Sequence, residues 1–424
     1  MKKKLIKIGI IGLGYVGLPL ASAFSKKFFT VGFDLNKERI KQLKLGVDKT
    51  QELSKKEINN AKKLFFTNDR KYLNSVNCYI VTVPTPINKS RKPDLKPLLN
   101  ASKMIGKALK KDDIVIYEST VYPGCTEEKC VPILEQYSNL KYNKDFYCGY
   151  SPERINPGDK KNKILNIKKV TSGSNKKIAT FVDSLYKEII IAGTHMAPNI
   201  RVAEASKVIE NTQRDLNIAY MNELSNIFYK LNINFNDVLK AAETKWNFLP
   251  FRPGLVGGHC IGVDPYYLIH KSSNSGYEPK VIMSSRYLNN KMGDYVSSKF
   301  IKKMKKKSIK LDKSRILIMG LTFKENCPDL RNSGISRVIK NLKKKNCIID
   351  FYDPLVTQKE IKKEYGKKSI TKLTNEKYDG IIIAVAHECF KKLDIKNIIK
   401  LCKNNKVIFD LKSIFDKKHT DLTL

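Results

Sequence analysis

The feature that most constrains the fold of this chain is a glycine-rich turn near its N-terminus, Gly12-x-Gly14-x-x-Gly17. An apolar β-run at residues 7–13 precedes the turn, and the pattern predicts a helix from there through roughly Lys27. The first glycine permits the tight turn, the second lets a pyrophosphate approach the backbone, and the third lets helix and strand pack closely. The context therefore predicts a dinucleotide-binding domain, with a purely structural turn as the alternative.

Asp34 closes the next predicted strand, residues 31–34, and lies 17 residues after Gly17. A carboxylate at this position would accept hydrogen bonds from the adenosine ribose of the dinucleotide. No basic residue follows Asp34 immediately, which favours NAD over NADP. Arg39 is a further candidate contact to the cofactor, but its position on the following helix is more typical of a solvated surface charge.

The rest of the N-terminal half alternates short apolar runs with helical segments, which is typical of a parallel sheet. The runs at residues 78–83 and 114–117 each end in a loop that contains Pro or Thr. Ligands collect at the carboxyl ends of strands in such sheets. We therefore expect the loops Thr82–Pro86 and Glu118–Gly124 to lie at a ligand-binding edge, although each could be an ordinary strand-end loop.

A long helix without Pro or Gly is predicted from Arg201 to Leu231. Helical sequence follows to about Lys307 and is interrupted by the loop Pro250–Pro265. A second α/β pattern begins at Arg315. The predicted fold class is α/β, with two Rossmann-like parallel-sheet domains joined by a long central helix and a helical dimerisation domain. The expected domains are a NAD-binding domain at 1–198, a helical domain at 199–307 and an α/β domain at 308–424.

Glu204, Lys207 and Asn211 fall at positions i, i+3 and i+7 of the long helix and therefore share a face. Apolar residues on the other sides, such as Val208 and Ile209, predict a helix that is buried nearly all round. A lysine and an asparagine in such a helix are costly unless they are paired. The alternative is a solvated polar stripe.

Cys260 lies in the segment Gly257-Gly258-His259-Cys260-Ile261-Gly262-Val263-Asp264-Pro265. A small buried hydrophobe is the default interpretation of a cysteine. However, the flanking glycines allow a substrate to approach closely, and Asp264 follows four residues later. A cysteine nucleophile in a chain that also binds a hydride acceptor would allow an alcohol to be oxidised through the aldehyde to a carboxylate. Adjacent His259 is expected to have a loop-packing role.

Two further segments offer charged side chains after apolar runs. Ser151-Pro152-Glu153-Arg154 places a carboxylate there, although a Glu–Arg pair is usually a surface ion pair. The segment Gly320–Arg331 lacks the dinucleotide glycines but provides Lys324 and Arg331 before a helix, which suits a diphosphate.

The formal net charge of +39 suggests nucleic-acid binding at first sight, but only 11 of the 80 basic residues are arginine and the lysines are spread along the chain. Specific nucleic-acid recognition favours clustered arginines, so an anionic small substrate is the better expectation. The nine cysteines are scattered without a CxxC pair, and the histidines show no metal-ligand spacing. We therefore expect no metal site and a cytoplasmic location. No run of 18 apolar residues predicts a membrane span.

Taken in order, these segments resemble the UDP-glucose/GDP-mannose dehydrogenase family over nearly the whole chain. The segments that carry the resemblance are GLGYVGLPLA, VPTP, STVYPG, SPERI, the Lys207–Asn211 helix, GGHCIGVDP and GLTFKENCPDLR. Within the family, residues 251–268 are most similar to the UDP-N-acetylhexosamine 6-dehydrogenases. One departure is Cys125, where the family commonly has threonine. The resemblance implies a four-electron oxidation of the C6 hydroxyl by NAD through a Cys260 thiohemiacetal and thioester, which would supply acidic sugars for a surface polysaccharide or glycan.

The resemblance also implies roles for individual residues. Cys260 would attack the C6 aldehyde, Lys207 and Asn211 would stabilise the oxyanion, and Glu153 would be the base in the hydrolytic step. Asp264 would orient Lys207 or a water that Thr120 helps to hold. The implied cofactor contacts are Gly12, Gly14, Tyr15, Val16, Gly17, Asp34, Arg39, Thr85, Thr120 and Arg331. The implied contacts to the UDP-sugar are Glu153, Arg154, Lys207, Asn211, Phe251, Arg252, Gly257 and Lys324. The family's long central helix usually forms a dimer contact, so a homodimer or higher homo-oligomer is expected.

Several alternatives remain open from the sequence. UDP-glucose, UDP-mannosamine-type and GDP-mannose substrates belong to the same family, and the gluco or galacto configuration depends on a few pocket contacts. A two-electron dehydrogenase of the 6-phosphogluconate or 3-hydroxy-acid type shares the N-terminal pattern, but such enzymes use a lysine without a catalytic cysteine. A non-catalytic nucleotide-binding or nucleic-acid-binding protein would form no NADH.

Overall fold

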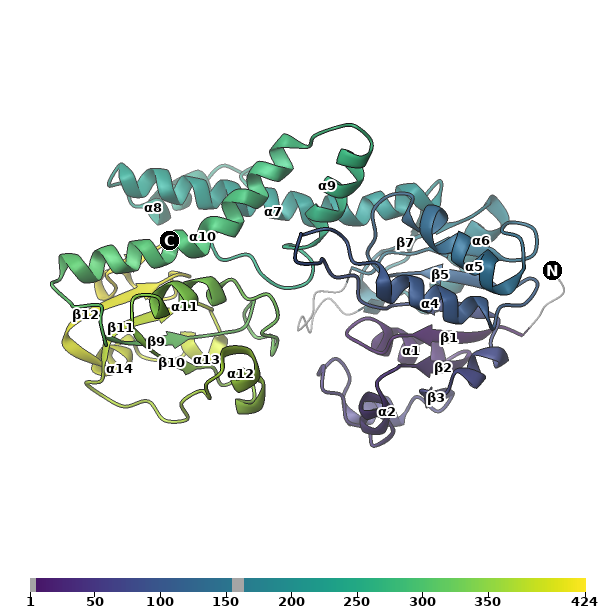
Figure 1. Cartoon of the computed structure of the whole chain (residues 1–424), viewed down its shortest axis with the longest axis horizontal. Helices are drawn as coiled ribbons and strands as arrows, with labels where there is room; N and C mark the ends of the chain where they lie inside the picture. Colours follow the sequence, from purple (N-terminus) through teal and green to yellow (C-terminus); the bar gives the residue numbers. More distant parts are fainter. Residues whose placement is uncertain (1–4, 155–163) are drawn as a thin grey trace. The chain divides into compact units, whose positions relative to one another are not determined.

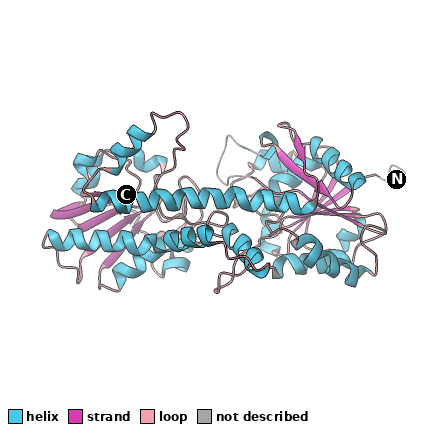
Figure 2. Cartoon of the chain, turned by 90° about the horizontal axis from the view of Figure 1, so that it is seen from above, coloured by secondary structure: helices cyan, strands magenta, loops and turns pink. Residues whose placement is uncertain are grey.

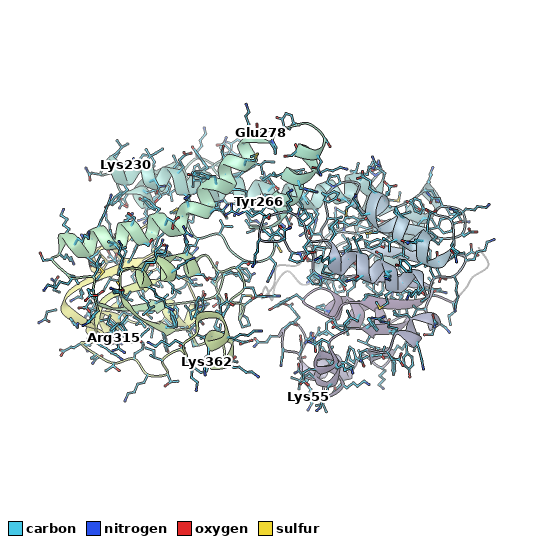
Figure 3. All side chains as sticks on the ribbon, viewed as in Figure 1. Lys55, Lys230, Tyr266, Glu278, Arg315 and Lys362 are labelled. Carbon is cyan, nitrogen blue, oxygen red and sulfur yellow. The ribbon has the colours of Figure 1, made fainter. Side chains whose placement is uncertain are left out.

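The computed structural model describes residues 5–154 and 164–424 and divides the chain into two compact units. Unit 1 comprises Met1–Glu210 and Tyr266–Tyr277, and unit 2 comprises Asn211–Pro265 and Glu278–Leu424. The chain therefore leaves unit 1, returns to it at Tyr266 and leaves it again before Glu278, two positions that Figure 3 labels. Unit 1 is consequently built from two separate stretches of sequence.

Unit 1 contains an eight-stranded sheet in the order β3-β2-β1-β4-β5-β6-β7-β8. All neighbouring strands are parallel except β6 and β7, which pair antiparallel through Gly149 and Tyr150. The strand order reverses between β1 and β4, which is the position where open α/β sheets bind ligands. The strands are β1 (Lys7–Ile11), β2 (Phe29–Phe33), β3 (Leu64–Thr67), β4 (Cys78–Val81), β5 (Ile114–Tyr117), β6 (Tyr147–Tyr150), β7 (Lys169–Gly173) and β8 (Thr194–Met196).

The core of unit 1 forms because its central strands β4 and β5 are short runs of mostly β-branched and aromatic residues that are buried on both faces. Ile8 and Ile10 of β1 pack with Leu20 and Phe24 of the helix that follows the glycine turn. That helix, α1, ends at Ser25, two residues earlier than expected. The helices of this unit are α1 (Gly17–Ser25), α2 (Lys37–Lys44), α3 (Lys55–Asn59), α4 (Lys96–Gly106), α5 (Val131–Ser138), α6 (Lys176–Lys187) and most of α9 (Asp264–Asn274).

Unit 2 contains a parallel five-stranded sheet in the order β10-β9-β11-β12-β13. Its order reverses between β9 and β11, which again creates a switch point at the strand ends. Separate buried clusters cover the two faces of the sheet, and Figure 2 shows helices on both sides of the strands in each unit. The strands are β9 (Arg315–Met319), β10 (Ile348–Tyr352), β11 (Tyr378–Ile383), β12 (Cys402–Asp410) and β13 (Leu422–Thr423). The helices around it are α10 (Lys280–Lys306), α11 (Ile335–Lys343), α12 (Gln358–Tyr365), α13 (Glu388–Lys391) and α14 (Ile395–Lys400).

The predicted long helix is α7 (Ile200–Lys230), which carries its N-terminal turns in unit 1 and continues into unit 2, where α8 (Phe235–Ala242) follows (Figure 1). The expectation that this helix is buried nearly all round is wrong, because Ile209 is 55% exposed and Val202 and Ile227 are also exposed. Helical spacing assigns residues to a face but does not say whether that face is covered within the same chain.

Exposed lysines occur on separate elements of the surface. Lys55 on α3, Lys230 on α7 and Lys362 on α12 are labelled in Figure 3 and are all exposed. In the part of the chain that the structure describes, no helix is both long enough and apolar enough to cross a membrane.

Candidate active site

The glycine turn after β1 has the geometry expected for an approach to pyrophosphate. Gly12 has φ +97°, and a Cβ on it would lie 3.0 Å from the carbonyl oxygen of Thr82. A Cβ on Gly17 would overlap the carbonyl oxygen of Gly12, so helix α1 packs too closely on the turn for any side chain there. By contrast, a Cβ on Gly14 would meet no atom within 4 Å. The turn is thus closed towards the sheet and open at Gly14, above the N-terminus of a helix that favours anions.

Asp34 lies directly beside this turn. Its Oδ2 accepts the backbone N–H of Leu13 at 2.9 Å, and its Oδ1 accepts that of Asn36 at 2.9 Å. A carboxylate has about four acceptor positions, so capacity remains for the two hydroxyls of a ribose. The residues present therefore fit an NAD molecule bound across the turn.

Arg39 does not lie on the solvated surface, and that interpretation is wrong. The side chain is buried, its Nε donates to the carbonyl oxygen of Leu13 at 2.9 Å, and its Nη1 lies 2.8 Å from Asp48 Oδ1. Burial raises the pKa of Asp48, but hydrogen bonds from Thr50, Leu53 and Arg39 outweigh it and hold that pKa below its usual range. Arg39 therefore supports the turn through its bond to Leu13, and the ion pair with Asp48 holds the Arg39 side chain in place.

The loops after β4 and β5 meet the glycine turn at the same edge of the sheet. Thr82 Oγ1 donates to the carbonyl oxygen of Gly12 at 2.7 Å, and Ser119 Oγ donates to that of Val83 at 2.7 Å. Thr85 accepts the hydroxyl of Tyr267 on its carbonyl oxygen at 2.9 Å, and Thr120 is partly exposed. The structure thus brings together three of the segments that the sequence placed at the ligand edge.

Glu153 and Arg154 follow β6. The side chain of Glu153 is buried, while Arg154 Nε lies 3.3 Å from Glu210 Oε2 on α7. Ile155, the last residue of the SPERI segment, lies outside the described residues. Arg154 thus pairs with Glu210 and not with the adjacent Glu153, and a contact of Glu153 or Arg154 to substrate stays a prediction.

A buried lysine that the motifs do not reveal supports this loop. Lys169 at the start of β7 is 4% exposed, and its Nζ lies 2.6 Å from Glu118 Oε2 and 3.1 Å from the carbonyl oxygen of Pro152. The hydroxyl of Tyr186 donates to the other oxygen of Glu118. The only sequence signal was a lysine adjoining a buried strand, which by itself is uninformative. Lys169 holds the residue directly before Glu153.

The polar face of α7 is buried, so the alternative of a solvated stripe is wrong. Glu204, Lys207 and Asn211 are each at most 5% exposed. Glu204 accepts the backbone N–H groups of Gly124 at 2.5 Å and Thr126 at 2.9 Å. Burial raises the pKa of the Glu204 carboxyl to about 7, although these donors act in the opposite direction. Helix α7 is thereby fastened to the loop that follows Thr120.

The loop that carries Cys260 belongs to unit 2, and Cys260 itself is partly exposed. Asp264, at the end of the loop, is buried and accepts the side-chain N–H of Asn211 on α7 at 2.6 Å. A Cβ on Gly257 would lie 2.6 Å from the carbonyl oxygen of Asn332. The loop backbone therefore packs closely against the segment between β9 and α11. Two of the predicted catalytic residues, Asn211 and Asp264, are thus direct partners.

His259 is exposed and its Nε2 lies 3.5 Å from Asp329 Oδ2, so its loop-packing role stays a prediction. Arg331 also pairs with Asp329, at 2.7 Å. Burial raises the pKa of Asp329, but hydrogen bonds from His259 and Arg331 outweigh it and hold the pKa well below its usual range. Arg252 is exposed and paired with Glu243.

The loop that carries Lys324 lies at the switch point of the second sheet. The backbone N–H of Asn326 donates to His387 Nδ1 at 3.0 Å, and Thr322 Oγ1 lies 3.2 Å from His387 Nε2. Asp353, at the end of β10, accepts the N–H groups of Leu321 and Thr322. This buried histidine, which no motif indicated, contacts the Asn326 backbone and the Thr322 hydroxyl on either side of Lys324, whose side chain is partly exposed.

Comparison with known proteins covers most of the chain. Residues 6–190 match the NAD binding domain of the UDP-glucose/GDP-mannose dehydrogenase family, residues 201–291 its central domain and residues 317–417 its UDP binding domain. Proteins named UDP-N-acetyl-D-glucosamine 6-dehydrogenase from Pseudomonas aeruginosa and Salmonella typhi are 56% and 55% identical over 99% of this chain and 99% of their own. The solved structure of a UDP-D-ManNAc dehydrogenase from Pyrococcus horikoshii is 29% identical, with a TM-score of 0.89, and the match covers 99% of this chain and 98% of that one.

Proposed function

Because this chain belongs to the UDP-glucose/GDP-mannose dehydrogenase family, we propose that it oxidises the C6 hydroxyl of UDP-N-acetyl-D-glucosamine to the carboxylate, with water and two molecules of NAD. The observation that carries the proposal is the 56% identity over 99% of both chains to a relative named for this activity. Bound NAD would accept a hydride in each of two oxidation steps. The product is a UDP-linked uronate, an acidic precursor suited to a surface polysaccharide or glycan.

Cys260 is the nucleophile in this proposal. Its thiolate adds to the C6 aldehyde formed by the first oxidation and gives a thiohemiacetal. Oxidation of the thiohemiacetal gives a thioester, which water hydrolyses to release the carboxylate and regenerate the thiol. Partial exposure of Cys260 in a glycine-rich loop supports this role, because the nucleophile must be accessible to substrate.

Lys207 and Asn211 stabilise the negative charge that develops on the C6 oxygen. Both side chains are buried on the same face of α7, where fixed donors interact with charge more strongly than in water. Asp264 supports this role because its carboxylate holds the Asn211 amide at 2.6 Å and fixes which way it points. Glu153 acts as base in the hydrolytic step, with Thr120 helping to hold the water.

The remaining predicted binding residues contact either NAD or the UDP-sugar. Asp34 binds the adenosine ribose and the glycine turn binds the pyrophosphate of NAD, with Arg39 acting through the turn that it braces. The further cofactor contacts in the proposal are Tyr15, Val16, Thr85 and Arg331. The contacts to the UDP-sugar are Arg154, Phe251, Arg252, Gly257 and Lys324, in addition to the catalytic residues.

The same proposal assigns one task to each part of the chain. Residues 1–198 bind NAD, residues 199–307 provide the catalytic helix face and the cysteine loop, and residues 308–424 bind the UDP-sugar. A cytoplasmic location is part of the proposal, since nine cysteines scattered along the chain without a CxxC pair suit a reducing compartment.

A panel of UDP-sugars with NAD, followed by nicotinamide absorbance, tests the function. UDP-N-acetylglucosamine should give the highest kcat/KM and yield two NADH for each sugar consumed, without free aldehyde. UDP-N-acetylmannosamine is the second candidate, because the structural match with a TM-score of 0.89 is to a protein named for that substrate. A ratio of one NADH per sugar would contradict the four-electron reaction. Equal turnover of UDP-N-acetylgalactosamine would contradict a preference for the gluco configuration.

We also propose that the chain forms a dimer through a groove between α7 and α10 in unit 2. The groove is lined by apolar side chains that include Leu216 and Met292, and Tyr220, Val281 and Tyr287 are 55%, 70% and 67% exposed. Exposed apolar surface of this kind marks an interaction site. A second copy of the same groove is the partner, since a two-fold contact places each apolar face against an identical one.

A further inference from the structure

The start of the cysteine loop is held by a buried side chain from α7. Asn222 is fully buried; its Nδ2 donates to the carbonyl oxygen of Gly254 at 3.0 Å, and its Oδ1 accepts the N–H of Gly254 at 2.8 Å. Residues 251–257 belong to no helix or strand. A side chain therefore satisfies both backbone groups of Gly254, as a neighbouring strand would elsewhere.

A chain of hydrogen bonds fixes the orientation of this amide. The Asp215 carboxylate can only accept, so Asn289 presents its NH2 group to it, at 2.8 Å. The Asn289 oxygen therefore faces Asn222 and accepts its Nδ2 at 2.9 Å. That leaves the Asn222 oxygen for the N–H of Gly254. Arg286 holds Asp215 from α10 at 2.5 Å, so the series runs from a buried ion pair to the loop backbone.

The other end of the loop is attached to the same helix. Asn211, eleven residues before Asn222 on α7, holds Asp264 at 2.6 Å. Eleven residues of α-helix span about 16 Å. The segment that carries Cys260 is thus fastened at Gly254 and at Asp264 to two points of one rigid element, both within unit 2.

We propose that Asn222 is a positioning residue for the reaction: by clamping Gly254 it sets where the loop presents the thiol of Cys260. It touches neither substrate nor cofactor in this role. The inference rests on the proposed function for the importance of Cys260 to turnover, but the clamp itself is a property of the loop. Loss of a buried hydrogen bond costs about 1–2 kcal/mol, which corresponds to roughly a 5- to 30-fold change in the population of a released loop.

The test compares Asn222→Ala and Asn222→Asp with the wild type. The aspartate keeps the shape but places an oxygen against the two acceptors, Gly254 O and Asn289 Oδ1. Alkylation of Cys260 by iodoacetamide, followed by peptide mass spectrometry without substrate, should accelerate by about fivefold or more, while exposed Cys389 serves as the internal reference. In turnover, kcat should fall by about tenfold with an unchanged KM for NAD, since Asn222 does not touch the cofactor turn.

Asn341→Ala is the matched control. Its Nδ2 also makes two hydrogen bonds within unit 2, to Asp294 at 2.8 Å and Ser297 at 2.9 Å, but none to the cysteine loop. An alkylation rate for Cys260 within twofold of wild type in a folded Asn222 variant overturns the proposal. Equal acceleration in Asn341→Ala also overturns it.

The clamp can also be tested if the Asn222 variants do not fold or if the proposed function is wrong. If neither Asn222 variant folds, hydrogen exchange of the wild type decides, because the Gly254 amide should exchange about 30-fold or more slowly than an unprotected amide. Exchange at the unprotected rate overturns the clamp. If the wild type forms no NADH with any UDP-sugar, the proposed function fails, whereas the alkylation comparison still supports or overturns the clamp.

Discussion

Asp34 accepts the backbone N–H of Leu13 from a distance of 21 residues, with 2.9 Å between Oδ2 and the amide nitrogen. The same carboxylate holds Asn36 N–H, and Leu13 is itself fully buried. Asp34 therefore has two tasks, since it closes the backbone of the glycine turn and presents its remaining acceptor positions to a ribose. A change at this residue should affect cofactor choice and stability together.

We expect Asp34→Ala to raise the KM for NAD and to narrow the ratio of NAD to NADP activity. Repulsion between a carboxylate and a 2′-phosphate in a partly desolvated site is worth about 1–4 kcal/mol, or roughly tenfold to several hundredfold in preference. The variant should also lose about 1–3 kcal/mol of stability, because a buried N–H at Leu13 loses its acceptor. Steady-state kinetics and urea unfolding measure the two effects.

Asp34→Asn is the control that separates these effects. It keeps an oxygen for one backbone donor and removes the charge, so it should retain more stability than the alanine variant and still accept NADP better than the wild type. Equal use of NADP and NAD by the wild type would show that Asp34 is not the ribose ligand.

Cys260→Ser should allow the first oxidation, since removal of a hydride from the alcohol needs no thiol. A serine oxygen can then form an ester with the uronate that water hydrolyses slowly, so the enzyme should stop after one turnover. Intact mass after incubation with substrate and NAD should rise by the mass of the attached product. Sustained turnover by the serine variant at the wild-type rate would reduce Cys260 to a packing residue.

Glu204 should make stability fall as pH rises towards 8. Burial raises the pKa of its carboxyl to about 7 in the folded state, above the value of about 4.5 expected when unfolded. The folded protein then binds more protons than the unfolded chain between these values, so the free energy of unfolding decreases through this window. A shift of this size corresponds to a few kcal/mol, about 1.4 kcal/mol for each pKa unit.

The measurement is urea unfolding of the wild type and of Glu204→Gln at pH 5.5, 7 and 8.5. Glutamine keeps one acceptor for the N–H groups of Gly124 and Thr126 and does not ionise. The difference in stability between the two proteins should therefore move in favour of glutamine as pH rises. Parallel curves for the two proteins would contradict the assignment.

Tyr220→Glu or Val281→Glu should dissociate the proposed dimer. Each places a charge in the apolar groove between α7 and α10, where an identical copy would bring two such charges into a desolvated contact. Light scattering after gel filtration should show a mass close to the 48.5 kDa of one chain. Ile191→Glu, at a residue that is 78% exposed in unit 1, should leave the mass of the assembly unchanged. A dimer that survives both groove variants would place the interface elsewhere.

The parts of the fold that sequence patterns predicted well are those fixed by neighbouring residues. The glycine turn, β5 at Ile114–Tyr117 and the span of α7 depend on local sterics and periodicity, so the structure places them within a residue or two of expectation. The position of the loops at the ligand-binding edge was also predictable, because a parallel sheet brings the carboxyl ends of its strands together.

The parts that could not be predicted depend on partners distant in the chain. Glu118 pairs with Lys169 across 51 residues and Asn222 with Gly254 across 32, and no local pattern connects either pair. Arg39 was misplaced for the same reason, since its helix position resembles a surface site until Asp48 folds back against it. Burial of a charge is decided by whether a partner arrives, and the periodicity of a single helix does not contain that information.

The return of α9 to unit 1 has a consequence for the order in which the protein folds during synthesis. Tyr267 donates to the carbonyl oxygen of Thr85, and Lys271 pairs with Glu128 at 2.8 Å, so residues 266–277 complete the surface around the loops after β4 and β5. At roughly 5–20 residues per second, the ribosome needs several seconds to progress from Glu210 to Tyr277. During that interval the N-terminal unit of the nascent chain lacks residues 266–277 at its ligand-binding edge. A chain truncated at residue 198 would lack α9 permanently.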